Sequence, residues 1–349
     1  MRIGVGLGRN APDDWESASA FAVEAERLGV DSIWSGEAWG FDGATPLAYI
    51  AARTSRVRLG TSILQIGART PALTAMTAMS LASMTQDRFV LGLGASTPQI
   101  MEGWHGVAFE RPIQRTREVT EIIRLIESRE RVAYGGEIYR IPLPGAVRPM
   151  RTAASPRRPL PVYIASVGPR NLRLTGELAD GWIGNCFLPE TAEAFFGPLR
   201  AGAEAVGRSL ADLELQVPVT LEFDDDLDTL AKRHAEGYAF TFGAMGAANR
   251  NFYVEAFARQ GFEEVRDVHR LWLDGRRDEA QDLVPVEIAL KTNLLGTAET
   301  VKDRLRAYRD VGVDALRVGL RGADIGEQLG QLGRLMDLVR EVSSETAEP

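Results

Sequence analysis

The fold of this chain is indicated by two short stretches of sequence, RVRLGTSI at residues 56–63 and RFVLGLGAS at residues 88–96. Each is a strand-like run that ends in glycine and small residues, and each follows a segment of helical character, at residues 44–53 and 71–84. Strands and helices that alternate at this spacing predict a parallel sheet with right-handed crossovers. Small residues at the ends of strands let a ligand approach the backbone closely. The pattern therefore predicts a β/α barrel that binds a flat, anionic ligand at the C-terminal ends of its strands.

The same alternation continues through most of the chain. Two segments interrupt it: a hairpin with a Pro/Arg-rich loop at about residues 130–160, and a run of helices at about residues 224–290. Because eight strands remain, we expect an α/β fold, a single (β/α)8 TIM barrel over residues 1–342, rather than a doubly wound sheet. Residues 343–349 are expected to form a disordered tail. The expected strands cover residues 3–7, 31–35, 56–63, 88–96, 161–166, 181–185, 213–221 and 315–320.

The composition of the 349 residues restricts the class of protein without identifying its function. With 45% hydrophobic and 25% charged residues it is typical of a globular protein. The formal net charge of −8 argues against nucleic acid and anionic membranes as partners, because both select basic surfaces. No apolar run approaches the ~18 residues of a membrane span, and the N-terminus does not resemble a signal peptide. We therefore expect a cytoplasmic enzyme.

Neither a metal site nor a disulfide is expected. The single cysteine, Cys186, rules out an intramolecular disulfide and most cysteine metal sites. The acidic run at residues 224–226 lacks the spacing of a calcium loop and has no histidine nearby. It is interpreted as the exposed start of a helix.

Four parts of the sequence carry a resemblance to a known family: SGEAWG at residues 35–40, residues 59–63, residues 91–96 with 98–104, and residues 164–171 with 179–182. They resemble the bacterial luciferase-like superfamily and, within it, the oxidoreductases that use the deazaflavin coenzyme F420. The resemblance extends over nearly the whole chain, in the same order. It implies a flat ring bound across the C-terminal mouth of the barrel, on a bulge with a non-prolyl cis peptide at Ser62–Ile63 and with Ile63 behind the ring.

The resemblance also implies a homodimer that forms through the helices beside strands two to four. The helix at residues 71–84 has a small, apolar face that would suit such an interface, although the same face could pack onto the barrel. The residues of this face are Ala72, Ala75, Met76, Met79 and Ala82.

The resemblance indicates which titratable groups lie at the barrel mouth. The acidic position after the second strand corresponds to Glu37, whereas Ala38 stands where family members often carry a catalytic histidine. Ala95 stands where related enzymes can carry an acid. Glu37 is therefore one catalytic candidate, because a carboxylate at an apolar mouth can have a raised pKa and act as a general acid or base; alternatively it only contacts and orients the ring. His105 is the second candidate, and its alternative is a packed or surface histidine.

A strand-to-helix turn at residues 165–171 predicts the binding site of the cofactor phosphate. The turn contains glycine and has Pro169 at the first helical position. Such a turn presents free amides and the positive end of the helix dipole to an anion; the alternative is an ordinary turn with a surface arginine. The expected cofactor contacts are Glu37, Ser62, Ile63, Gly94, Ala95, Ser96, Thr97, Val167, Gly168 and Arg170, and the expected substrate contacts are Arg9, Asn10, Trp39 and Trp104.

The function implied by the resemblance is that of an F420-dependent reductase or dehydrogenase. Such an enzyme exchanges a hydride between C5 of the deazaflavin and a small organic substrate. Two alternatives stay open. An FMN-dependent monooxygenase of the same fold is disfavoured by the missing histidine at Ala38, and a non-catalytic deazaflavin-binding protein is consistent with Ala38 and Ala95.

Overall fold

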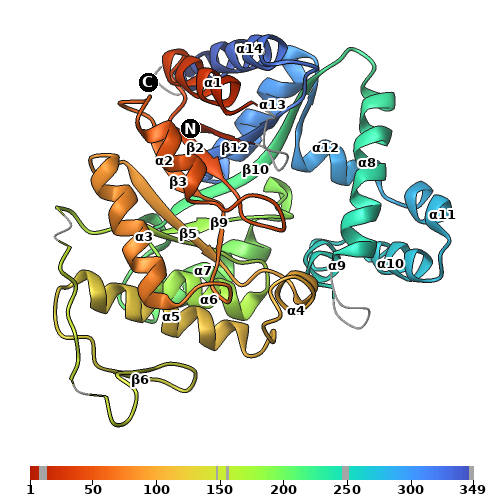
Figure 1. Ribbon diagram of the computed structural model, residues 1–349. Helices are drawn as coiled ribbons and strands as arrows, with labels where there is room; N and C mark the ends of the chain where they lie inside the picture. The colour runs from red at the N-terminus through yellow and green to blue at the C-terminus, as the bar shows by residue number, and fades with distance from the viewer. Residues whose placement is uncertain (8–13, 147, 155–156, 246–250, 346–349) are drawn as a thin grey trace.

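The computed structural model describes residues 1–7, 14–146, 148–154, 157–245 and 251–345, and its main strands close into a parallel barrel (Figure 1). Neighbouring strands pair in parallel in the order β1, β2, β3, β5, β8, β9 and β10, and β12 lies between β10 and β1. The predicted (β/α)8 architecture is therefore confirmed. The barrel strands are β1 (Arg2–Gly6), β2 (Ser32–Ser35), β3 (Arg58–Thr61), β5 (Phe89–Gly94), β8 (Val162–Ala165), β9 (Gly181–Ile183), β10 (Glu214–Phe223) and β12 (Ala315–Leu320).

Helices between successive strands cover the outside of the barrel (Figure 1). Their ends follow local sequence signals. The side chain of Asp14 accepts hydrogen bonds from the first backbone amides of α1, and Gly29, with φ of 94°, ends that helix in the left-handed conformation that glycine adopts without strain. The covering helices are α1 (Trp15–Leu28), α2 (Thr45–Ala51), α3 (Pro71–Met84), α5 (Pro112–Glu127), α6 (Pro169–Leu178), α7 (Glu193–Glu204), α13 (Ala298–Asp310) and α14 (Ile325–Ser344).

The first insertion contains the predicted hairpin, made of β6 (Tyr134–Gly135) and β7 (Arg140–Ile141). The fully buried carboxylate of Glu118, on α5, ties the hairpin to the barrel because it accepts hydrogen bonds from the backbone amides of residues 137–139. The Ile141–Pro142 bond that follows the hairpin is cis.

The second insertion is helical, as predicted, and stands beside the barrel (Figure 1). Its first helix begins where the acidic run was expected to start one: the carboxylate of Asp226 accepts a hydrogen bond of 3.1 Å from the amide of Thr229. The helices are α8 (Leu227–Ala244), α9 (Phe252–Ala258), α10 (Val265–Leu273), α11 (Arg277–Asp282) and α12 (Val286–Thr292).

Several short elements and one boundary differ from the sequence-based expectation. Strands β4 (Leu64–Gln65) and β11 (Leu294–Gly296) extend the sheet but are too short to show alternation in the sequence. Helix α14 runs to Ser344, into the segment predicted as a disordered tail, and residues 346–349 lie outside the described part of the chain. The remaining short elements are α4 (Pro98–Gly103) and the 3-10 turns η1 (Pro189–Thr191) and η2 (Leu210–Asp212).

An ion-pair network joins the N-terminal ends of three barrel strands and the segment before β2. The guanidinium of Arg58 donates to Asp31 at 2.6 Å and to Glu214 at 2.8 Å, and Arg2 lies 2.8 Å from Glu214. Burial alone would raise the pKa of Glu214, but the hydrogen bonds and the charge of Arg58 outweigh burial and hold it below its ordinary value. The network therefore stabilises the end of the barrel opposite the strand C-termini.

Apolar side chains fill the barrel above this network. Trp34, Val90, Tyr163 and Ile183 form one buried cluster, against which the partly buried side chain of Ile63 packs. The cluster closes the interior of the barrel and forms the bottom of the barrel mouth.

Candidate active site

The predicted cis peptide lies at the C-terminal end of β3. The Ser62–Ile63 bond is cis, as expected, and the chain then continues into β4, which pairs with β5. The amide of Ser62 donates to the carbonyl oxygen of Ser35 at 2.6 Å. A Cβ atom on Gly94 would lie 2.9 Å from Cγ1 of Ile63, so the end of β5 needs glycine beside the bulge. The expected contacts Ser62, Ile63 and Gly94 therefore lie together.

The carboxylate of Glu37 is held at this bulge. It is 9% exposed and forms an ion pair of 2.7 Å with Arg69. Its other hydrogen bonds come from the backbone amides of Gln65 at 3.2 Å and Gly43 at 3.4 Å, and its own amide donates to the carbonyl oxygen of Ile63 at 3.2 Å. The hydrogen bond that Arg69 donates to the carboxylate of Glu37 raises the pKa of Arg69. Both carboxylate oxygens thus already accept hydrogen bonds.

The guanidinium of Arg317, on β12, reaches the same bulge and donates a hydrogen bond to the hydroxyl of Ser62. Sequence reasoning did not identify Arg317, Arg69 or Gln65. A charged residue inside the otherwise apolar strand 315–320 was the available signal for Arg317. Arg69 and Gln65 act through partners about thirty residues away, which a single sequence does not reveal.

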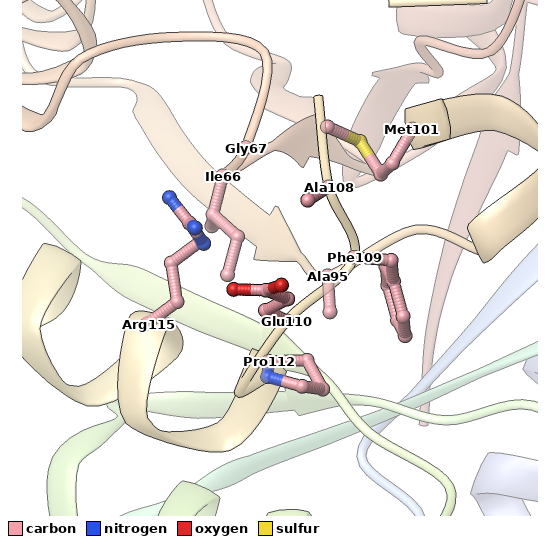
Figure 2. Close-up of a pocket in the computed structure, with 9 residues that line it drawn as sticks. All are labelled: Ile66, Gly67, Ala95, Met101, Ala108, Phe109, Glu110, Pro112 and Arg115. Atoms are coloured by element: carbon pink, nitrogen blue, oxygen red, sulfur yellow. The ribbon is translucent and has the colours of Figure 1, made fainter. Parts of the chain in front are cut away.

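The loop after β5 supplies the next expected contacts. Ser96 has φ of 67°, and the hydroxyl oxygen of Thr97 is buried with no hydrogen-bond partner among the described residues. A small pocket of about 10 Å³, room for roughly one water molecule, lies beside Ala95 (Figure 2). Figure 2 shows Arg115, from the first turn of α5, on the side of the pocket away from Met101, with Glu110, from the loop before α5, between them. The lining residues are Ile66, Gly67, Ala95, Met101, Ala108, Phe109, Glu110, Pro112 and Arg115.

The other catalytic and substrate candidates lie on loops around the mouth. His105 follows α4; it is half-buried, and its Nε2 atom is buried with no partner among the described residues. Trp39, after β2, and Trp104, after α4, are 49% and 63% exposed. Arg9 and Asn10 fall outside the described residues.

The predicted phosphate turn connects β8 to α6. Gly168 is the N-cap residue of α6 and supplies no side chain to its free amides, and Pro169 occupies the first helical position, as predicted. Arg170 is exposed, and the side-chain oxygen of Asn171 is buried without a partner among the described residues. A residue of the second insertion also reaches the turn: the guanidinium of Arg259 donates to the carbonyl oxygen of Val167 at 2.8 Å. The turn therefore has free amides and two nearby arginines, of which the sequence predicted one.

Within the described ranges, no three His, Cys, Asp or Glu side chains are grouped so that they could hold a metal ion. Cys186 is buried, and burial raises the pKa of its thiol. In the part of the chain that the structure covers, none of the helices combines the length and the apolar character needed to cross a bilayer.

Known proteins share this sequence pattern and this barrel. Residues 1–315 match the family described as luciferase-like monooxygenase. A Mycobacterium tuberculosis protein that is provisionally named a coenzyme F420-dependent oxidoreductase is 33% identical over 344 residues, or 95% of this chain and 99% of that protein. The F420-dependent glucose-6-phosphate dehydrogenase of Kineococcus radiotolerans is 33% identical over 221 residues, or 59% of this chain and 64% of that protein. The coenzyme F420-dependent tetrahydromethanopterin reductase of Methanopyrus kandleri has the same fold, with a TM-score of 0.79 at 21% identity over 97% of this chain and 98% of that chain.

Proposed function

The chain belongs to the luciferase-like monooxygenase family, and from this premise we propose that it exchanges a hydride between coenzyme F420 and a small organic substrate. It is an oxidoreductase, and F420 is its cofactor, as in the relatives from Mycobacterium tuberculosis and Kineococcus radiotolerans. The observation that carries the proposal is the apolar surface at the barrel mouth, where Ile63 packs against the buried cluster of Trp34, Val90, Tyr163 and Ile183.

The residues around the mouth fit a deazaflavin with a phosphate group. Ile63 offers an apolar surface for the flat ring. Gly94, at the end of β5, has no side chain that would crowd Ile63. Buried polar atoms without partners are rare in folded proteins. The hydroxyl of Thr97 and the side-chain oxygen of Asn171 have no partner among the described residues, so they are suited to a polar ligand. The free amides at the N-terminus of α6 suit the phosphate.

The bound deazaflavin supplies or accepts the hydride at C5, while the protein orients the reactants. Ile63 supports the ring. Glu37 fixes the bulge that carries Ile63, because its amide binds the carbonyl of Ile63 and its carboxylate binds Arg69. Trp39 and Trp104 are proposed to contact the substrate. His105, whose Nε2 atom has no partner among the described residues, is proposed to exchange the proton that accompanies hydride transfer.

The proposal is tested by titrating the purified protein with F420 and with FMN and following the change in cofactor fluorescence. We expect F420 to bind at micromolar concentration or tighter, and at least about tenfold (~1.4 kcal/mol) more tightly than FMN. The absorption spectrum of cofactor that copurifies provides a second measurement. Equal affinities, or copurification of FMN alone, would favour the monooxygenase alternative.

We also propose a homodimer that forms through α3. Of the residues expected at this interface, Ala75 and Met79 are buried against the barrel. The outward face is nevertheless apolar, since Leu73, Met76 and Met84 are 47%, 59% and 62% exposed. A second copy of the chain is the occupant that this face suits, because the helix is apolar on both its inner and its outer side.

A further inference from the structure

The inner wall of the barrel holds a polar side chain at the level of Ile63. A Cβ atom on Gly94 would lie 2.9 Å from Cγ1 of Ile63 and 3.4 Å from Cβ of Ala165, so these three residues adjoin. Ala165 is in register with Ile183 on the next strand, and Ile183 is in register with Gln216 on β10. Register partners in a parallel sheet point to the same face. These residues therefore follow one another around the inside of the barrel, at the bottom of its mouth.

Gln216 and Ile63 belong to opposite walls of the barrel. On one side β5, β8 and β9 separate β3 from β10, and on the other side β1, β2 and β12 separate them. Ile63 follows β3, and Gln216 lies on β10. A flat ring that spans the mouth from Ile63 therefore extends toward the amide of Gln216.

The amide of Gln216 is buried and has no partner in the part of the chain that the structure describes. The residue is 1% exposed, and both its side-chain nitrogen and its side-chain oxygen lack a hydrogen bond. Its neighbours on the inner wall are apolar, since Ile63 and Ala165 pack against the buried cluster that contains Ile183. An amide gives up its hydrogen bonds to water when it is buried, so leaving both atoms unpaired destabilises the fold. A local conflict of this kind is typical of a site that a polar ligand completes.

The chemistry of the amide indicates which group of a ligand it would bind. A glutamine side chain donates through its nitrogen and accepts through its oxygen, so it suits an edge that presents a carbonyl oxygen beside an N–H group. The pyrimidine part of a deazaflavin has such an edge, an N3–H group between the carbonyl groups at C2 and C4. We propose that Gln216 binds the pyrimidine edge of the deazaflavin through both atoms of its amide. This inference rests on the proposed function, because it requires the ring to bind against Ile63.

The first test compares the wild type with Gln216→Met, which keeps the length of the side chain and removes both polar atoms. Fluorescence titration should show that Gln216→Met binds F420 at least about tenfold (~1.4 kcal/mol) more weakly. The cofactor-free variant should melt at a temperature no lower than the wild type, because an apolar group replaces a buried amide without partners. A glutamine that only stabilises the fold would give a lower melting temperature with unchanged affinity, and that result would overturn the inference.

A modified ligand tests the hydrogen bond itself. 8-Hydroxy-5-deazariboflavin and its N3-methyl derivative differ in the N–H group that the side-chain oxygen of Gln216 is proposed to bind. We expect methylation to weaken binding to the wild type by at least about tenfold and to have much less effect on binding to Gln216→Met. An equal effect of methylation on the two proteins would contradict the inference.

Two controls separate the possible failures. Gln281→Met makes the matched change on α11, at the edge of the helical insertion away from the barrel (Figure 1), and should leave F420 affinity unchanged. If Gln216→Met binds F420 and both riboflavin analogues as the wild type does, the amide binds only internal water, and this inference alone is overturned. Failure of the wild type to bind F420 would overturn the proposed function as well.

Discussion

Glu37 joins the loop after β2 to residues 63–69, which follow β3. It binds Arg69 and the amides of Gly43 and Gln65, and the amide of Glu37 itself binds Ile63. The sequence identified Glu37 as a titratable group at the mouth but left its role open between proton transfer and orientation. Because its oxygens already accept hydrogen bonds, we favour orientation of the ring through the bulge.

A Glu37→Gln variant separates the two roles. The change leaves the guanidinium of Arg69 without its carboxylate, so we expect the free energy of unfolding to fall by about 2 kcal/mol. Cofactor affinity should also fall, while kcat with an accepted substrate stays within about tenfold of the wild type. Chemical denaturation, cofactor titration and steady-state kinetics measure the three quantities, and Arg69→Gln should lower stability to a similar extent. A loss of ~10²-fold in kcat with unchanged cofactor affinity would instead identify proton transfer.

The phosphate turn offers a second comparison between single residues. Arg170 was predicted from the sequence to bind the phosphate, and the structure adds Arg259, which is held on the carbonyl oxygen of Val167. We expect Arg170→Ala and Arg259→Gln each to weaken F420 binding by about tenfold, because each removes a charge-assisted hydrogen bond to the phosphate. Titration with the phosphate-free deazaflavin riboside is the control and should show no loss. An equal loss for both ligands would place that arginine away from the phosphate.

Among the secondary-structure elements, length decided what could be predicted. All eight barrel strands and the helix Pro71–Met84 were identified, because apolar spacing and glycine or proline boundaries repeat over enough residues. The strands β4 and β11 were missed, since two or three residues show no period. The cis peptide came from family resemblance rather than from spacing. The contacts of Arg317 and Arg259 could not be predicted, because they link residues far apart in the sequence.

The ion-pair network at the N-terminal ends of the strands gives the barrel a pH-dependent stability. The pKa of Glu214 in the folded protein lies below its ordinary value, so the unfolded chain takes up the proton first as the pH falls. The stabilisation is therefore complete above the unfolded pKa of about 4.3 and is lost as the pH falls through the lower folded pKa. We expect Glu214→Gln to lower stability at pH 7 by about 3 kcal/mol and to flatten its decline below about pH 4.3.

Urea denaturation at a series of pH values measures this effect. Cofactor affinity should remain unchanged, because the network lies at the opposite end of the barrel from the proposed site. The control is Glu341→Gln, which breaks an exposed pair with Lys302 and should cost less than about 1 kcal/mol. A decline with pH as steep in Glu214→Gln as in the wild type would contradict the assignment.

For the molecule as a whole, the apolar outer face of α3 is the feature that supports the proposed homodimer. Figure 1 shows α3 on the outside of the barrel, with its neighbours α2 and α5 on either side. The helical insertion lies on a different side of the barrel. Pairing of two copies through α3 would therefore leave the insertion accessible.

A charged residue on this face should prevent pairing. We expect the wild type to be a dimer at micromolar concentration and Met76→Glu to be a monomer, because the carboxylate would lose its hydration at the interface. Light scattering measures the molar mass directly. Met150→Glu is the matched control: Met150 is 77% exposed on the loop after the hairpin, and its replacement should leave the mass unchanged. A monomeric wild type would refute the dimer.

The pairing of β1 with β12 also has a consequence for biosynthesis. The first strand of the barrel acquires one of its two neighbours only when residues 315–320 have been made. At ~5–20 residues per second, synthesis of the roughly 310 intervening residues takes about 15–60 s. Throughout that interval the nascent chain carries an open sheet edge, which other nascent chains can pair with. Chaperones that shield this edge on the ribosome would prevent such pairing. The yield of active protein during overexpression is therefore expected to depend on how much chaperone is present.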